Sequence, residues 1–342
     1  MRIDSMYNSY VNRILVGSDA ALFTVPIDDH VIVRGHAVFD TATIVKGNLY
    51  RHRVHIDRLF ESAEKAGLDL SFLVDQSEEN DVERQKEQIE DIEIQVARAG
   101  GVRNGMIRMW LTAGPGNLGV TKAGCRTTLY MICYGGNPFN TFGAQGDSNQ
   151  QVLASKIPGV KEWTISEKVP MKEKVLATMK SSNYLMNALG ATDATKSGGK
   201  FGIWVDPVTD EVYEASVRNV VFVLQNDVLI TPPYMDGRIL KGCTVRRVVE
   251  LAKKQLLDNE GNGDVILKEV VTDQVVYKRE LLKIGIKEMF LVSGDTHLDP
   301  VVQWDDLQIG DGKPGLVFQR IAQMIIDEAM DGSSPHHKKI EY

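Results

Sequence analysis

Residues 171–190 contain a lysine whose setting suits a nucleophile. Residues 175–179 are a short apolar run of strand length, Lys180 stands where that run stops, and Ser-Ser-Asn follows. Serine and asparagine favour turns and helix caps, and from Tyr184 the apolar spacing is helical, with Gly190 as the predicted end. A desolvated lysine favours its neutral amine, which attacks carbonyl groups. Most lysines are solvated surface residues, so Lys180 alone establishes no reaction.

Other side chains with chemical potential stand at the ends of predicted elements. Gly242-Cys243-Thr244 precedes a helical pattern, where free N–H groups could bind an anion, although an ordinary threonine cap would look the same. Arg58 lies off the apolar stripe of its predicted helix, which is also typical of a solvated arginine. Glu214 ends a predicted hairpin strand and could equally be an edge-strand carboxylate in water.

The predicted elements mix strands and helices with several hairpins. Residues 31–45 are rich in strand formers and lead through Lys46-Gly-Asn into residues 49–50, which is a hairpin signal. We predict helices over residues 55–67, over the charged stretch 75–99 and after Gly242. Further strands are predicted at residues 106–112, 127–134, 151–156, 201–205, 211–214, 219–224, 228–231 and 289–292, with a tight turn at 113–116. This pattern predicts an α+β or mixed α/β chain.

Composition sets the domain organisation and excludes some partners. A Gly-, Asn-, Gln- and Ser-rich segment follows residue 135, so we expect a smaller α/β domain over 1–135, a linker over 136–150, a larger domain carrying Lys180 over 151–330, and a polar tail over 331–342. The net charge of −7 argues against a nucleic-acid or membrane partner. Three cysteines without CxxC spacing indicate neither a disulfide framework nor a metal site. No targeting segment is evident, which predicts a cytoplasmic protein.

The lysine stretch has a family resemblance. Lys180-Ser-x-Asn-Tyr-Leu-x-Asn resembles the cofactor-lysine motif of the fold-type IV (class IV) pyridoxal-phosphate enzymes, which include branched-chain and D-amino-acid aminotransferases and aminodeoxychorismate lyases. Further segments follow the family's order, so the resemblance spans roughly residues 25–315. It implies a two-domain fold-type IV enzyme, a pyridoxal 5′-phosphate cofactor held by Lys180, and a homodimer in which the partner completes each pocket.

The resemblance also assigns roles around the cofactor. The family's Gly-x-Thr turn corresponds to Cys243 and Thr244, and its His-x-x-Arg-Leu arginine corresponds to Arg58, both as phosphate ligands. Ser293-Gly294 resembles the family's second phosphate turn, although a plain strand-end turn would read alike.

Two further positions face the cofactor ring in the family. Glu214, in Glu-Ala-x-x-x-Asn, corresponds to the glutamate that pairs with the pyridine nitrogen, where an anion keeps the ring protonated. Tyr184 corresponds to a tyrosine that binds the phenolic oxygen in branched-chain enzymes, and a tyrosine packed on a helix face is the alternative.

The substrate side carries mixed signals. Phe39, in Arg34-Gly-His-x-Val-Phe-Asp, resembles a residue of the pocket strand of branched-chain enzymes, and the Ala-Gly-Pro-Gly turn lacks the Arg-x-His carboxylate trap of bacterial D-amino-acid enzymes. Several separated motifs nevertheless look most like a second, eukaryotic-type group of D-amino-acid transaminases. Arg108 and Arg34 are the candidates for holding the substrate carboxylate, and each could instead be a surface arginine.

These observations predict a transaminase that exchanges an amino group between an amino acid and a 2-oxo acid, with D-amino acids as the favoured donors. The alternatives are a branched-chain L-amino-acid or (R)-amine transaminase and an aminodeoxychorismate lyase. A cofactor-binding protein without turnover is a further alternative, against which the presence of both Lys180 and Glu214 argues.

Overall fold

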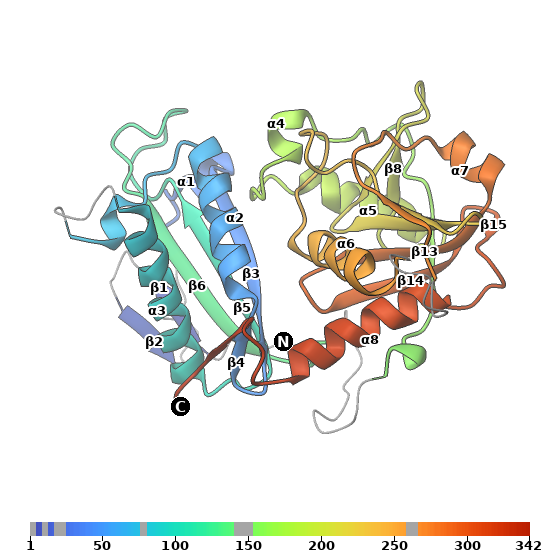
Figure 1. Cartoon of the computed structure of the whole chain (residues 1–342). Helices are drawn as coiled ribbons and strands as arrows, with labels where there is room; N and C mark the ends of the chain where they lie inside the picture. Colours follow the sequence, from blue (N-terminus) through green and yellow to red (C-terminus); the bar gives the residue numbers. More distant parts are fainter. Residues whose placement is uncertain (1–4, 9–12, 17–24, 76–80, 140–152, 258–265) are drawn as a thin grey trace. The chain divides into compact units, whose positions relative to one another are not determined.

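The chain forms two compact units, which are described one at a time. The computed structural model describes residues 5–8, 13–16, 25–75, 81–139, 153–257 and 266–342 (Figure 1). The first unit comprises Met1–Gln150, Met179–Asn183 and Ala329–Tyr342, and the second comprises Gln151–Thr178 and Tyr184–Glu328. Both units combine helices with strands, as the α+β prediction requires. The predicted linker, 136–150, lies mostly outside the described residues, and the predicted domain boundaries stay a prediction.

The first unit is built on an antiparallel sheet. Its strand order is β16 (His337–Lys339), β4 (Asn48–Tyr50), β3 (Ala37–Val45), β5 (Gly105–Thr112), β6 (Thr128–Gly135), β1 (Ser5–Asn8) and β2 (Arg13–Val16). The predicted hairpin between β3 and β4 is confirmed, and its central residues Lys46 and Gly47 have φ angles of 47° and 79°. Positive φ at both positions gives the primed turn that matches the twist of paired strands.

Two amphipathic helices pack on this sheet (Figure 1). They are α2 (His52–Lys65) and α3 (Val82–Gly100), which confirm the two helices predicted for the first domain. Ile56 and Leu59 of α2 and Ile89 of α3 are fully buried, and such burial is the main stabilising term for helices of this length. A short 3₁₀ turn, Ser71–Leu73, lies between the two helices in sequence.

Two predictions in the first unit are wrong. Residues 31–34 belong to a short helix, α1 (His30–Arg34), because the Asp29 side chain caps it and Gly35 ends it at φ 64°, so the strand begins only at Ala37. The predicted tight turn at 113–116 is part of a longer loop, 113–127, that joins β5 to β6. Within this loop a Cβ on Gly114 would lie 1.6 Å from the Arg126 carbonyl oxygen, which explains that glycine.

The second unit contains a mixed sheet and a separate hairpin. The sheet runs β12 (Glu269–Val271), β11 (Val228–Ile230), β10 (Asn219–Leu224), β13 (Ile286–Ser293), β14 (His297–Trp304) and β15 (Leu307–Gln308), with β7 (Val160–Glu162) parallel to β14. The hairpin is β8 (Ile203–Val205) with β9 (Val212–Ala215). A buried carboxylate, Glu162, fixes the start of this hairpin by accepting the backbone N–H groups of Phe201 and Gly202 at 3.0 and 2.8 Å.

The helices of the second unit are α4 (Lys174–Ala177), α5 (Leu185–Lys196), α6 (Cys243–Gln255), α7 (Lys278–Ile284) and, for most of its length, α8 (Leu316–Met330). The helix predicted after Gly242 is therefore confirmed, and its valines Val245 and Val248 are fully buried. Phe318 of α8 packs against Phe290 of β13 with ring centroids 5.6 Å apart.

Three further predictions around the lysine stretch are wrong. Residues 175–177 form part of α4, since an apolar run this short suits a helix as well as a strand. Residues 154–156 form a 3₁₀ turn, where a strand was predicted over 151–156, of which 151–152 lie outside the described residues. Gly190 was predicted to end the helix but lies inside α5. Close packing explains the glycine, because a Cβ there would lie 2.8 Å from Ile165 and 3.1 Å from Trp204.

Two segments that were expected in the second domain or beyond it belong to the first unit. Lys180 lies in the segment Met179–Asn183, which runs antiparallel beside β3. The predicted polar tail forms β16, which pairs with β4, and buries Ile340, whose N–H donates to the Gly47 carbonyl at 3.0 Å. Backbone pairing at the edge of a sheet requires no apolar pattern, so neither association is evident from the sequence. Among the described residues, none of the helices is long and apolar enough to cross a membrane.

Candidate active site

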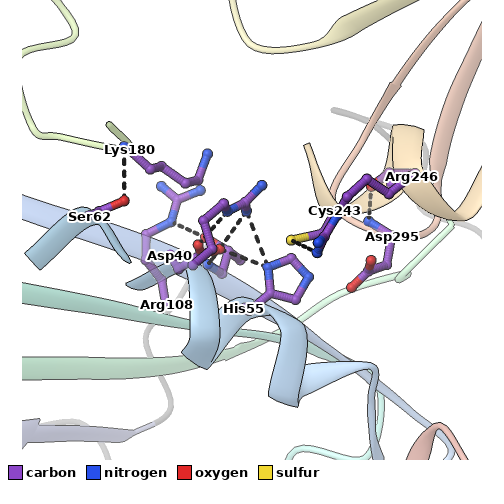
Figure 2. Close-up of polar contacts among 11 residues, drawn as sticks. Asp40, His55, Ser62, Arg108, Lys180, Cys243, Arg246 and Asp295 are labelled. Carbon is purple, nitrogen blue, oxygen red and sulfur yellow. Dashed lines mark hydrogen bonds and ion pairs between the residues drawn. The ribbon is translucent and has the colours of Figure 1, made fainter. Parts of the chain in front are cut away.

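Lys180 is held by its backbone in the first unit. Its carbonyl accepts the Phe39 N–H at 2.8 Å, the Ser182 N–H donates to the Ala37 carbonyl at 2.8 Å, and the Lys180 N–H donates to Ser62 Oγ at 3.2 Å (Figure 2). These bonds fix an extended segment next to β3. The half-buried side chain places its ammonium 4.7 Å from the centroid of the Phe39 ring.

Asn183 explains part of the lysine motif. Asn183 lies three residues after Lys180, and its side-chain amide donates to the Gly35 carbonyl at 3.1 Å. A Cβ on Gly35 would lie 2.7 Å from the Asn183 side-chain oxygen, and Gly35 has φ 64°, so glycine is required at the opposite position. The asparagine of the Lys-Ser-x-Asn motif therefore binds the lysine segment to the turn that precedes β3 through a hydrogen bond.

Arg108 shares the Phe39 ring with Lys180. It comes from β5, where it lies opposite Thr41 of β3, and its Nε donates to Thr41 Oγ1 at 3.0 Å. Its guanidinium carbon lies 5.6 Å from the Phe39 ring centroid. The structure thus brings a reactive-amine candidate and a carboxylate-binding candidate to one aromatic ring.

Arg34, the other carboxylate candidate, is placed differently. It is exposed at the end of α1, and it donates to the carbonyls of Gly119, at 3.0 Å, and of Leu118 and Val33. These bonds tie α1 to the loop 113–127. A substrate would have to compete with backbone carbonyls that already occupy the guanidinium.

Arg58 is buried in an ion pair and is not a solvated helix arginine. Its Nε and one Nη lie 2.8 Å from the two carboxylate oxygens of Asp40, and its side chain is only 11% exposed. His55 Nδ1 lies 2.7 Å from Asp40 Oδ1, so the carboxylate has two partners, the buried His55 and the half-buried Arg58 (Figure 2). Burial by itself would raise the pKa of Asp40, but Arg58 and His55 outweigh it and hold that pKa well below its usual range. Asp40 therefore stays ionised and fixes the plane of the Arg58 guanidinium.

In the second unit, Glu214 stands at the junction of three segments. It belongs to β9 and is 5% exposed, which excludes the solvated edge-strand interpretation. Its Oε2 accepts the Leu240 N–H at 3.3 Å and lies 3.5 Å from Asn219 Nδ2. Asn219 in turn donates to the Leu240 carbonyl at 3.1 Å, so the asparagine of the Glu-Ala-x-x-x-Asn motif fastens Glu214 to the chain before α6.

Lys172 is a neighbour of Glu214 that sequence reasoning missed. Its ammonium lies 4.0 Å from Glu214 Oε1, and both side chains are 6% exposed. The same ammonium lies 5.4 Å from the centroid of the Tyr184 ring. Tyr184 is half-buried at the N-cap of α5 and is not packed on the helix face. Nothing in the sequence distinguishes Lys172 from Lys168 or Lys174. Only the structure does so, because the Lys172 side chain is shielded from solvent while the other two lysines are exposed.

The two predicted anion turns of the second unit touch each other. Gly242 is the N-cap of α6, so the threonine-cap interpretation is wrong for Thr244, whose Oγ1 accepts the Asp295 N–H at 2.8 Å (Figure 2). Asp295 directly follows Ser293-Gly294 at the end of β13, where Gly294 has φ 51°. Cys243, the first residue of α6, is buried, with its Sγ 4.0 Å from an Arg246 nitrogen.

These groups fit pyridoxal phosphate chemically. Taken by itself, the first unit holds an amine at Lys180 and a fixed guanidinium at Arg58. Taken by itself, the second unit holds a buried carboxylate at Glu214 and a helix start beside a glycine turn. A Cβ on Gly242 would lie 1.9 Å from the Asn219 side chain, so this helix start must keep its bare backbone. Within the described ranges no cluster of His, Cys, Asp and Glu could hold a metal ion, so no metal ligand is assigned.

The chain is similar to several known proteins. The family model described as "Amino-transferase class IV" matches residues 37–276. The chain is 34% identical over 331 residues, 96% of its length and 77% of the relative, to a chloroplastic D-amino-acid transaminase of Arabidopsis thaliana. It is 25% identical to a D-alanine aminotransferase of Bacillus licheniformis, over 90% of this chain and 92% of that one.

Branched-chain relatives also match. A putative branched-chain-amino-acid aminotransferase of Methanocaldococcus jannaschii is 25% identical, over 89% of this chain and 90% of that one. The solved structure of the branched-chain aminotransferase from Escherichia coli superposes with a TM-score of 0.75 over 100% of both chains, at 21% identity. The T.th. branched-chain aminotransferase, solved in complex with N-(5′-phosphopyridoxyl)-L-glutamate, gives 0.77 over 100% of both chains at 19% identity. These structures have the same fold as the present chain.

Proposed function

Since this chain belongs to the class IV aminotransferases, which depend on pyridoxal phosphate, we propose that it transfers amino groups from D-amino acids to 2-oxo acids. The observation that carries the proposal is the pairing of Lys180 and Arg108 on the Phe39 ring, because it sets a carboxylate-binding cation beside the reactive amine. The 34% identity with a D-amino-acid transaminase supports the D-configuration.

Each residue that we assign to the cofactor ring or to the reacting carbon has a proposed role. Bound pyridoxal phosphate supplies an electron sink that makes the substrate Cα–H acidic. Lys180 Nζ would hold the cofactor covalently, and the same amine would serve as the base that takes the Cα proton and returns it on the cofactor's side. Glu214 keeps the pyridine nitrogen protonated, and Tyr184 donates to the cofactor's phenolic oxygen.

The anion ligands hold the cofactor rather than the substrate. We assign Arg58 to the cofactor phosphate, together with the two turns formed by Cys243 and Thr244 and by Ser293 and Gly294. Thr244 supports this role because its hydroxyl holds the second turn through the Asp295 N–H. A guanidinium fixed by Asp40 would bind phosphate with little further loss of side-chain freedom.

The substrate carboxylate is assigned to Arg108, with Phe39 as a wall of the substrate pocket. A site that distinguishes D- from L-amino acids must fix the carboxylate, because exchange of hydrogen and side chain on Cα matters only once that group is anchored. Arg108 offers a guanidinium that engages only neutral partners among the contacts described for it, Thr41 and aromatic rings. Arg34 is the weaker candidate because backbone carbonyls already occupy it.

Stopped-flow absorption of the purified holoenzyme tests the proposal. D-Alanine should convert the bound cofactor to its amino form far faster than L-leucine does. Arg108→Met should slow that half-reaction about 100-fold, since it removes a charge-assisted pair, while the resting spectrum stays that of the wild type. Arg34→Met, the matched control, should react at the wild-type rate.

Other outcomes identify the rival functions. Fast conversion by L-leucine and none by D-alanine would assign the chain to branched-chain chemistry, and a fast reaction with an (R)-amine alone would assign it to amine transamination. Pyruvate release from aminodeoxychorismate, with neither amino acid reacting, would make it a lyase.

The homodimer is proposed on an apolar surface of the first unit. Ile27, Ile32, Leu118 and Val120 are 79, 48, 66 and 81% exposed, and they lie on or next to α1 and on the loop that Arg34 ties to it. Apolar side chains gathered in this way favour cover by another protein surface, and a second copy is the proposed cover. Sedimentation should give a dimer, which Leu118→Asp/Val120→Asp should dissociate.

A cytoplasmic location also stays a prediction, and imaging of the tagged full-length protein would test it.

A further inference from the structure

A second lysine is buried within ion-pair distance of the proposed ring partner. Lys172 precedes α4, its side chain is only 6% exposed, and its ammonium lies 4.0 Å from Glu214 Oε1. Lysine is almost never buried without a partner, because desolvation of an ammonium costs several kcal/mol. Among the residues that the structure describes, Glu214 is the only ion-pair partner of Lys172.

The surroundings of the pair fix the carboxylate from several sides. The Leu240 N–H donates to Glu214 Oε2 at 3.3 Å and Asn219 Nδ2 lies 3.5 Å from it, while Lys172 faces the other oxygen, Oε1. The Tyr184 ring lies 5.4 Å from the Lys172 ammonium, within the range of a cation–π contact. One cation therefore contacts two residues that are both assigned to the cofactor ring.

We propose that Lys172 is a positioning residue that holds Glu214 in its ionised form and limits how firmly Glu214 retains the proton of the pyridine nitrogen. The proposal rests on the role of Glu214 in the proposed function. A positive charge at this distance stabilises the carboxylate when no ligand is bound, and it weakens the attraction of that carboxylate for a proton when the cofactor is present. Lys172 would thus set the protonation state of the ring without touching the reacting atoms.

The first test is a pH titration of the visible absorption of the holoenzyme. Lys172→Met removes the charge and keeps the chain length, so the Glu214–cofactor pair should keep its proton to higher pH, and the spectral midpoint should rise by about one unit. Lys172→Arg keeps the charge and should restore the wild-type midpoint. Lys174→Met removes an exposed lysine two residues away and should leave the midpoint unchanged.

The coupling to Glu214 is tested by combining variants. Once Glu214→Gln has removed the carboxylate, Lys172→Met should shift the midpoint no further. Additive shifts would show that Lys172 acts independently of Glu214 and would overturn the proposal, as would a Lys172→Met midpoint equal to that of Lys174→Met.

Urea unfolding of the cofactor-free protein gives a readout that needs no turnover. Lys172→Met removes a cation that lies 4.0 Å from the buried Glu214 carboxylate and should lower the urea midpoint, and adding Glu214→Gln should recover part of that loss. If Lys172→Met does not fold, recovery of folding in the double variant supports the pair, and a double variant that also stays unfolded overturns it. Failure of the proposed function looks different, because it shows in which substrate converts the bound cofactor, whereas the pH and urea midpoints are measured without any substrate.

Discussion

Asp40 and Arg58 form a two-pronged ion pair in which both nitrogen–oxygen distances are 2.8 Å. The carboxylate is fully buried on β3, and His55 of α2 lies against the same oxygen that accepts an Arg58 Nη. Such a side-on geometry fixes the guanidinium plane, and Asp40 accepts two of the five N–H donors that an arginine carries. The pair therefore links the stability of the first unit to the phosphate role proposed for Arg58.

Removal of Arg58 should destabilise the protein as well as weaken cofactor binding. Arg58→Met leaves Asp40 buried without its main counter-charge, which should lower the free energy of unfolding by ~3–5 kcal/mol in urea titrations. Cofactor affinity should fall roughly 10- to 100-fold through loss of a charge-assisted contact.

A control separates these two effects. Asp40→Asn/Arg58→Met removes both charges, so it should recover part of the stability but none of the affinity for pyridoxal phosphate. Affinity for pyridoxal, which lacks the phosphate, should be the same in all variants. Equal losses for both compounds would mean that Arg58 supports the fold only.

Lys180 should carry the cofactor covalently. Borohydride reduces the C=N bond between a lysine and the cofactor, so peptide mass spectrometry after reduction should place the pyridoxyl group on the peptide that contains Lys180. Lys172 is the informative competitor, because its side chain is only 6% exposed and its ammonium lies near Glu214 and Tyr184. A label on Lys172 would disprove the assignment, and Lys180→Ala should abolish labelling.

Glu214 should affect the reaction rate, through protonation of the pyridine nitrogen, more than it affects cofactor affinity. Glu214→Gln replaces an anion by a neutral group of the same shape, so most of the cofactor affinity should remain while the rate of the half-reaction falls roughly 10²-fold. Single-turnover kinetics on fully loaded enzyme measures this directly. Loss of the cofactor with normal turnover in the loaded remainder would reverse the assignment.

His297 should make stability depend on pH. Burial, reinforced by Arg218, lowers the pKa of His297 from 6.5 to about 4, so between these values the unfolded chain binds a proton that the folded chain does not. The free energy of unfolding should therefore fall as the pH falls through this window, by up to about 1.4 kcal/mol per pH unit.

Urea titrations at several pH values provide the check. His297→Leu should flatten the profile between pH 6.5 and about 4, whereas His336→Leu, at an exposed position, should keep the wild-type slope. A profile unchanged by His297→Leu would show that other groups cause the acid sensitivity.

Local sequence patterns determined much of the fold and the chemical type of the site. The hairpin at Lys46-Gly47 and the helices α2, α3 and α6 follow from turn residues and apolar spacing, which act over a few residues. The lysine motif could also be recognised in the sequence, and its Asn183 binds the segment Met179–Asn183 to the Gly35 carbonyl. The family resemblance that these motifs carried is confirmed by the family model over residues 37–276.

Tertiary structure alone decided which charges are buried and with what. Apolar periodicity placed Arg58 off the buried stripe of its helix, and only the neighbouring strand supplies the buried Asp40 that makes it an ion-paired residue. Lys172 looks like its solvated neighbours in the sequence, yet it lies 4.0 Å from Glu214, 42 positions further along the chain. The pairing of Lys180 with β3 and of β16 with β4 uses backbone hydrogen bonds, which every residue type except proline can donate. Contacts between segments that are far apart in the sequence produce no periodic pattern of residue types, so local sequence patterns could not predict them.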